Sequence, residues 1–143
     1  MTPTSPTVAR WELIRRLRER RQQLGLDAAA VSKAVSISPA NWSHVEADRR
    51  MLTEEKLQIM CDLLEIDGAE RELIFELRAT GKQRGWWQDY SALFSTELLR
   101  FYGLEYGAEL VRTYDSVLIP GLLQTADYAH ALIASDTTFI PKA

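Results

Sequence analysis

The segment that decides the fold is Asp27–Ala47, which reads DAAAVSKAVSISPANWSHVEA. Asp27 can cap a short helix over residues 28–35, which is interrupted at Ser36-Ile37-Ser38. Ser38 is a favourable N-cap and Pro39 a favourable first helical residue, so a second helix is predicted over Pro39–Ala47. Two short helices joined by a tight turn are the pattern of a helix-turn-helix.

The flanking segments predict three more helices. Apolar residues recur at helical spacing over residues 10–24, 54–66 and 69–80, and glycines follow each of these segments. We therefore expect a five-helix domain over residues 9–80. Residues 1–8, rich in Pro, Thr and Ser, are expected to form a disordered arm.

The character of the chain changes after Gly81. Residues 81–85 have the composition of a linker, and residues 86–143 are expected to be the N-terminal portion of a second, helix-rich domain with a regulatory or partner-binding role. Within this domain we predict a helix, or two short ones, up to Gly103, a short strand over Leu110–Tyr114 and a last helix over Ala126–Ala134. The predicted fold class is mainly α.

Charge is distributed unevenly along the chain. The net charge is −3, but residues 1–52 carry nine Lys and Arg against five Asp and Glu, and the remainder carries eight against fifteen. A polyanion, if bound, would meet the basic N-terminal region, although two solvated surfaces of different charge would give the same composition.

Several classes of protein are not indicated. The single cysteine, Cys61, excludes a disulfide within the chain, and with only two histidines a zinc site is not expected. Residues 1–7 lack the basic start and apolar core of a signal peptide, and no apolar run approaches the ~20 residues that span a bilayer. We expect a cytoplasmic protein that is not an enzyme, without a catalytic site, metal, cofactor or membrane contact.

The helix over Pro39–Ala47 is expected to enter the major groove of DNA, as the second helix of such a motif does. Trp42 and Val45, three residues apart, should face inward. The residues left facing outward, and predicted to contact bases, are Ala40, Asn41, Ser43 and His44. Asn can pair bidentately with adenine, and Ala can meet a thymine methyl group.

Phosphate contacts supply most of the affinity of DNA-binding proteins. Arg49 and Arg50 directly follow the helix and are placed to reach the DNA backbone. The predicted phosphate contacts are Lys33, Ser38, Arg49 and Arg50. The other arginines near the N-terminus, in residues 15–20, could touch phosphate or pair with neighbouring glutamates.

The N-terminal region of the chain resembles the phage-repressor-like, or Xre/Cro, family of regulators. The matching run is Leu17-Arg18-Glu19-Arg20-Arg21, Gly25-Leu26, Val31, Ala34, Ile37-Ser38, Ser43, Val45-Glu46 and the Leu57/Met60/Leu64 helix. The resemblance implies an all-α fold, binding to double-stranded DNA at an inverted-repeat operator as a homodimer, and an ion pair between Arg21 and Glu46. The sequence departs from the family at Ala28 and Pro39, where a Gln is common, and at Asp48, where Gly is usual.

The C-terminal region resembles an uncharacterised domain that follows the helix-turn-helix in many actinobacterial regulators, some of them antitoxin-like and encoded beside a small partner protein. The residues that carry the resemblance are Gly85-Trp86-Trp87, Gly103-Leu104-Glu105, Ala108, Tyr114, residues 119–125 (IPGLLQT) and Asp127-Tyr128-Ala129. That domain is longer than the segment found here, so we expect the chain to be truncated or shortened.

The C-terminal region offers a surface for a protein or small-molecule partner. The candidate residues are Trp86, Trp87, Tyr114, Pro120, Leu122, Leu123, Gln124 and Tyr128. Packing between domains is the alternative role for the two tryptophans, and a turn with two core leucines is the alternative for residues 120–125. The sequence therefore leaves two functions open, a DNA-binding regulator controlled by a ligand or partner, and an antitoxin-like interaction module in which DNA binding is secondary.

Overall fold

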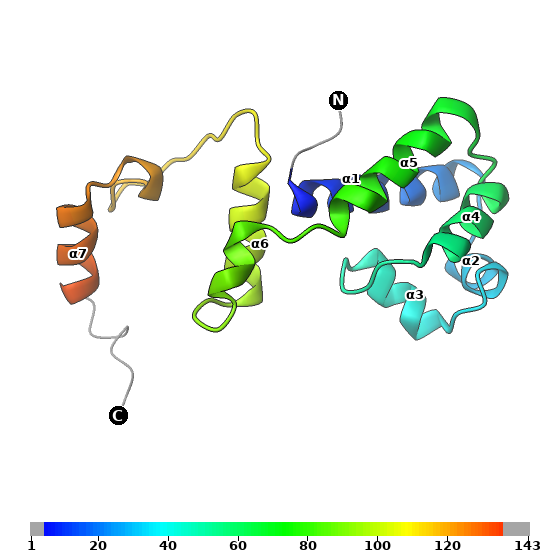
Figure 1. Cartoon of the computed structure of the whole chain (residues 1–143), viewed down its shortest axis with the longest axis horizontal. Helices are drawn as coiled ribbons and strands as arrows, with labels where there is room; N and C mark the ends of the chain where they lie inside the picture. The colour runs from blue at the N-terminus through cyan, green and yellow to red at the C-terminus, as the bar shows by residue number, and fades with distance from the viewer. Residues whose placement is uncertain (1–4, 136–143) are drawn as a thin grey trace. The chain divides into compact units, whose positions relative to one another are not determined.

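The structure, a computed structural model, describes residues 5–135, which are mainly helical (Figure 1). The α-helices are α1 (Pro6–Gln23), α2 (Ala28–Ala34), α3 (Pro39–Glu46), α4 (Glu54–Leu63), α5 (Gly68–Gly81), α6 (Thr96–Tyr106) and α7 (Ala126–Ser135). Two short 3₁₀ helices are η1 (Trp86–Tyr90) and η2 (Gly121–Leu123). The chain divides into one compact unit that ends at Glu109 and another that begins at Leu110.

The core of the first unit is built by the apolar faces of α1 to α5. Helix α1 packs along α5, and α2 contacts both α3 and α4. The fully or almost fully buried side chains include Leu13, Leu17, Val31, Val35, Trp42, Val45, Leu57, Met60, Cys61, Leu64, Ile74 and Leu77. Each side chain of this size stabilises the fold by roughly 1.5–3 kcal/mol when it leaves water, which explains why the helical spacing of these residues determines the fold. The five-helix prediction is confirmed.

Four consecutive helices end in the same way. The residues that follow the C-caps of α1 to α4 are Gly25, Ser36, Asp48 and Glu65, with φ angles of +64°, +50°, +58° and +52°. In each case two backbone N–H groups bond back into the last turn, as in Leu26 N to Arg21 O and Arg49 N to His44 O. This is the Schellman motif, which satisfies carbonyls that the helix itself leaves free. Three of the four positions are not glycine and therefore hold a strained left-handed conformation.

The residue after the left-handed position usually anchors the motif in the core. Leu26, Ile37 and Ile66 occupy this place after α1, α2 and α4, and all three pack against the buried core. After α3 the same place is taken by Arg49, which is exposed. Helix α3 thus ends in a basic side chain directed to solvent where the other helices end in an apolar anchor.

The N-terminus of the first helix differs from the prediction. Helix α1 begins at Pro6, not near Arg10, because the Ser5 side chain caps it by accepting from Val8 N and Pro6 occupies the first turn. Ser5 and Pro6 are buried. The predicted disordered arm is therefore wrong for residues 5–8, and residues 1–4 lie outside the described residues.

Helix α6 packs against the start of α1, which explains why the helix begins so early. The Ser5 hydroxyl donates to the carbonyl oxygen of Gly103 in α6. A Cβ at Gly103 would overlap the Thr7 side chain and lie 2.9 Å from the Trp87 ring, so only glycine permits this contact. Because α6 joins the first unit in this way, the predicted boundary at residues 81–85 does not separate two compact units.

The unit that begins at Leu110 is described up to Ser135. The predicted strand over Leu110–Tyr114 is wrong, since no strand is found in residues 5–135 and a strand needs a partner for its backbone groups. Asp115 Oδ1 accepts from the N–H groups of Val117 and Leu118, which lowers the pKa of that carboxyl group. Helix α7 follows at Ala126, close to the predicted start, and Thr125 Oγ1 caps it by accepting from Tyr128 N.

Candidate nucleic-acid interface

One face of helix α3 packs against the core, and the opposite face is exposed to solvent. Ser38 Oγ accepts from Asn41 N at 3.2 Å, and Pro39 occupies the first turn, as predicted. Trp42 and Val45 are 3% and 5% exposed, which confirms their predicted inward orientation. The helix therefore has a fixed position on the core before it meets any partner.

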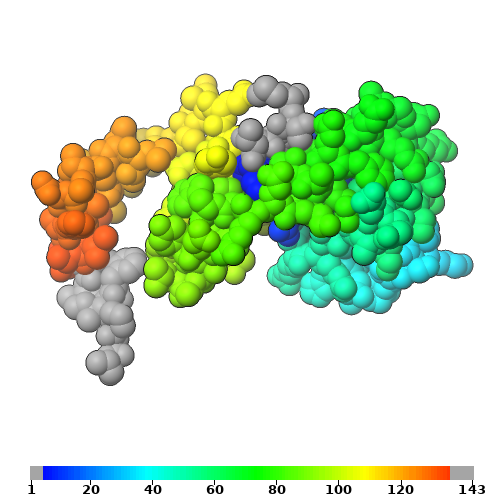
Figure 2. All heavy atoms as spheres, in the orientation of Figure 1, coloured from blue at the N-terminus to red at the C-terminus, as the bar shows by residue number. Residues whose placement is uncertain are grey.

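The outward side of α3 carries the residues predicted to contact bases. Ala40, Ser43 and His44 are exposed, and Asn41 is half-buried. Helix α3, cyan in Figure 2, lies at the surface of the unit. The structure thus brings the four residues together on one accessible helix, as a reading surface for base edges requires.

The predicted phosphate contacts lie around this helix. Lys33 in the last turn of α2, Ser38 at the start of α3, and Arg49 and Arg50 after its end are all exposed. Within residues 5–135, the side chains of Lys33 and Arg49 have no acid or hydrogen-bond acceptor as partner, which leaves both cations available to a polyanion. Ser38 Oγ already accepts from the backbone, but its O–H can still donate.

Arg50 makes a contact that sequence reasoning missed. Its Nη1 donates to Oδ1 of Asn41 at a distance of 3.0 Å. The two residues lie nine positions apart, and they meet only because the turn after α3 folds back along the helix. No pattern in the sequence marks this pairing.

Three arginines of α1 hold the C-terminal end of α3. Arg21 Nη2 lies 3.2 Å from Glu46 Oε1, which is the ion pair implied by the family resemblance, and Arg18 Nη2 donates to the Glu46 carbonyl oxygen at 2.9 Å. Arg10 Nε and Nη2 donate to Oδ1 and the carbonyl oxygen of Asp48, both at 2.8 Å. Cations are favourable at a helix C-terminus, where carbonyl groups carry partial negative charge.

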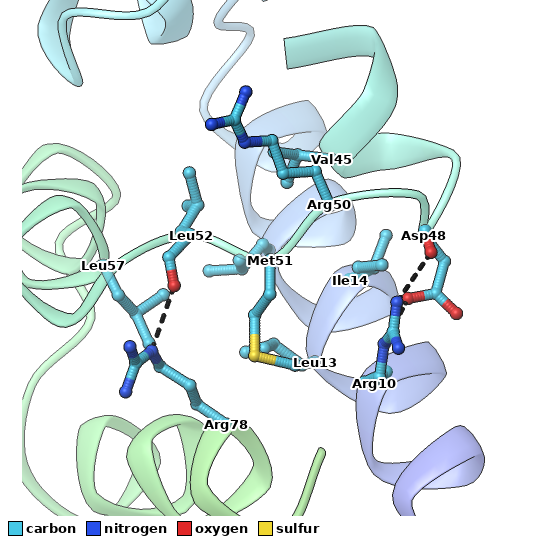
Figure 3. Close-up of a pocket in the computed structure, with 11 residues that line it drawn as sticks. Arg10, Leu13, Ile14, Val45, Asp48, Arg50, Met51, Leu52, Leu57 and Arg78 are labelled. Atoms are coloured by element: carbon cyan, nitrogen blue, oxygen red, sulfur yellow. Dashed lines mark hydrogen bonds and ion pairs between the residues drawn. The ribbon is translucent and has the colours of Figure 1, made fainter. Parts of the chain in front are cut away.

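The Arg10–Asp48 contact borders a small cavity beneath the loop that follows α3 (Figure 3). Its volume of ≈ 20 Å³ is about that of one water molecule, and its lining includes Leu13, Val45 and Leu57. A cavity of this size has no room for an effector.

The remaining arginines of α1 have partners within the protein, and Arg15 and Arg16 pair with Glu12, as the sequence allowed. Arg15 bonds to Glu12 and Glu19, and the pKa of Arg15 is raised by these bonds. Arg16 bonds to Glu12 and Glu70, and Arg20 Nε donates to the Leu64 carbonyl oxygen. Arg16 and Arg20 thus tie α1 to α5 and to the end of α4, whereas Arg15 pairs within α1.

The predicted partner surface is not exposed throughout. Trp87 is 1% exposed and packs against Gly85, Gly103 and Tyr106, so it belongs to the core and cannot receive a partner. Trp86 is 53% exposed and lies in an aromatic cluster with Tyr90 and Tyr102.

The other candidate partner residues lie in the second unit. Tyr114, Leu122 and Leu123 are exposed, so the two leucines are not core residues of the described unit. Pro120, Gln124 and Tyr128 are half-buried. The Gln124 side chain donates to the Ile119 carbonyl oxygen and the Tyr128 hydroxyl accepts from Ile119 N, so a local fold holds these residues together.

Residues 5–135 contain no group of three His, Cys, Asp or Glu side chains arranged to bind a metal. None of the helices described combines the length and the apolar composition needed to cross a membrane. Burial raises the pKa of the Cys61 thiol, which disfavours the reactive thiolate.

Comparison with known families agrees with the geometry. Residues 12–74 match the family model of a helix-turn-helix domain, and residues 98–142 match that of a domain of unknown function (DUF5753). No curated protein and no solved structure matches the chain. The first match includes most of the buried core of α1 to α5 and the whole of α3. The chain therefore carries a helix-turn-helix domain, followed by sequence that matches a domain of unknown function.

Proposed function

We propose that this protein is a sequence-specific transcriptional regulator that inserts α3 into the major groove of DNA. One observation supports the proposal most directly. Trp42 and Val45 hold α3 on the core of a helix-turn-helix domain, and the opposite side of the helix is exposed beside cations that lack partners within the described residues. Asn41, Ser43 and His44 then face base edges.

DNA binding by purified protein tests the proposal. Fluorescence anisotropy with DNA from upstream of the gene should show saturable binding that weakens as salt rises. Asn41→Ala should weaken binding to the cognate site by about 1–3 kcal/mol, with little effect on unrelated DNA. Arg49→Ala should weaken binding to all sequences and lower the salt slope by about one unit.

Arg84→Ala is the matched control. Arg84 is also an exposed arginine of this unit, but it follows α5 and pairs with Asp89. Its loss should leave DNA binding unchanged. Equal effects of the Arg84 and Arg49 variants would mean that the surface around α3 is not the binding surface.

We further propose that the protein binds an inverted repeat as a homodimer, with half-sites about one helical turn apart. Light scattering with and without operator DNA tests the stoichiometry. A single half-site that binds one chain as tightly as the full repeat would contradict this aspect of the proposal.

Control of DNA binding is assigned to the segment of the chain after Glu109, through a small-molecule effector or a protein partner. None of residues 110–135 is buried, and several large apolar side chains in this stretch are exposed. Tyr114, Val117 and Leu123 are 92%, 84% and 74% exposed. Exposed apolar area of this kind is typical of surfaces that are covered by a partner.

The same observation favours a second candidate, an antitoxin-like module that binds a small protein encoded by the adjacent gene. Co-expression with that product and purification on a tag carried by one partner separates the two. A stable complex formed by a chain that does not bind the upstream DNA tightly would support the second candidate. Tight operator binding with no captured partner would support the first.

A further inference from the structure

The turn after α3 directs Arg50 back toward the start of the helix. Asp48 in its left-handed conformation reverses the chain, and the N–H groups of both Arg49 and Arg50 donate to the carbonyl oxygen of His44, at 2.9 and 3.2 Å. In Figure 3 the Arg50 guanidinium points away from the side chains of Met51 and Leu13. The backbone of the turn thus fixes the position of Arg50 relative to α3, and the Arg50 side chain reaches Asn41 in the first turn of the helix.

The bond between these two side chains fixes the orientation of the Asn41 amide. A guanidinium group only donates hydrogen bonds, so Asn41 must turn its oxygen toward Arg50. The Asn41 amide nitrogen is then left with its two N–H donors, and no described residue accepts from it. The second lone pair of Oδ1 remains free as well.

Adenine presents N7 as an acceptor and N6–H as a donor in the major groove. The fixed amide matches this pattern, since Nδ2 can donate to N7 while Oδ1 accepts from N6–H and from Arg50 together. Guanine presents two acceptors there, N7 and O6. A side-chain amide presents an oxygen beside its NH2 group, so in a side-by-side contact its oxygen would face one of these two acceptors.

We propose that Arg50 is a specificity-determining residue, which positions the Asn41 amide so that it reads adenine. This inference rests on the proposed function and differs from it in assigning Arg50 a role beyond phosphate binding. Arg49 is assigned phosphate binding alone, because it is exposed and its side chain has no partner among the described residues. The effects of substitutions at these two adjacent arginines can therefore be compared directly.

The site is first selected by the wild-type chain from a pool of random duplex DNA. Binding is then measured on the selected duplex and on a duplex in which the adenine read by Asn41 is replaced, the position being identified by loss of preference in Asn41→Ala. Wild-type discrimination at this base pair should be about 5- to 150-fold. Arg50→Lys should keep the salt slope, because the charge is kept, but reduce this discrimination at least several-fold.

Arg49→Lys and Arg49→Ala are the controls, and both should keep the full discrimination. In a double-mutant cycle, Asn41→Ala should weaken cognate binding less in an Arg50→Ala background than in the wild type. Circular dichroism of each variant checks that α3 is folded.

These measurements distinguish failure of the positioning role of Arg50 from failure of the proposed function. Discrimination that survives in both Arg50 variants, or additive effects of the Arg50 and Asn41 variants, would overturn the positioning role while the proposed function stands. Failure of the wild-type chain to select any DNA would overturn the proposed function itself.

Discussion

Arg10 and Asp48 are joined by two hydrogen bonds, one to the carboxylate and one to the backbone carbonyl of the same residue, both 2.8 Å long. Asp48 has a φ of +58°, a conformation that a residue with a side chain adopts only at a cost. Glycine would adopt this conformation without that cost. Arg10 thus compensates for the absence of glycine at this position. It lies on α1, which contributes to the core against which α3 packs.

Removing this contact should destabilise the fold. We expect Arg10→Met, which keeps much of the aliphatic stem, to lower the free energy of unfolding by about 1–2 kcal/mol, because a partly buried carboxylate and a carbonyl lose a charged donor. Urea denaturation measures the difference. The control Arg84→Met breaks an ion pair whose side chains are 70% and 69% exposed and should change stability by less than about 0.5 kcal/mol. Equal losses in the two variants would argue against a compensating role for Arg10.

Glycine at another left-handed position should stabilise the protein. Glu65 follows α4 with a φ of +52°, and its contact with Arg20 is long, at 3.7 Å. We expect Glu65→Gly to raise the free energy of unfolding by about 0.5–1 kcal/mol, because glycine adopts this conformation without strain. Ala79→Gly, within α5, introduces the same residue at an ordinary helical position and should lower stability by about 1 kcal/mol. A loss of stability in both variants would show that no strain is stored at Glu65.

A methyl group at Gly103 should disrupt the contact between α1 and α6. The added Cβ would meet Thr7 and Trp87 at distances that no real pair of atoms adopts. We expect Gly103→Ala to lower the free energy of unfolding by about 1–3 kcal/mol and to shift the fluorescence of the buried Trp87. The control Gly121→Ala places a Cβ in open space and should be nearly neutral. Unchanged stability and fluorescence in Gly103→Ala would mean that α6 does not pack on α1.

Glu12 should contribute to the pH dependence of stability. The pKa of its carboxyl group is lowered from 4.5 by hydrogen bonds from Arg15 and Arg16 and by their charges, which outweigh the effect of burial. A lowered pKa in the folded state contributes stability that is present above pH 4.5 and is lost as the pH falls through the folded pKa. We expect Glu12→Gln to be less stable than the wild type at pH 7 and the difference to shrink below pH 4.5.

Denaturation midpoints at several pH values between 7 and 3 measure this effect. Glu72→Gln, at an exposed position of α5, serves as the control and should differ little from the wild type across the range. A stability difference for Glu12→Gln that stays constant over the whole range would contradict the assignment.

The features that were predictable from sequence are those that depend on local spacing. The helices α1 to α5, the caps at Asp27 and Ser38, and the inward faces of Trp42 and Val45 follow from periodicity and capping residues. The Arg21–Glu46 pair came from a family resemblance, and the structure contains it. These features can be read from a single helix or from two neighbouring ones.

The features that sequence reasoning missed depend on tertiary contacts. Residues 5–8 have the composition of a disordered arm, but Ser5 and Thr7 are ordered by their contact with Gly103, nearly a hundred residues away. The Arg50–Asn41 bond depends on a reversed turn whose central residue, Asp48, is held by Arg10. Residues Leu110–Tyr114 were predicted to form a strand, but residues 5–135 contain no strand with which they could pair.

The division of α3 into two faces has a consequence for how such proteins diversify. Trp42 and Val45 anchor the helix, while Ala40, Ser43 and His44 add almost nothing to the core. Under the proposed function, exchanging these outward residues should change the DNA sequence that is recognised, while the core that holds α3 stays the same. A library confined to them, with the Arg10–Asp48 and Arg50–Asn41 contacts retained, should yield folded regulators with new targets.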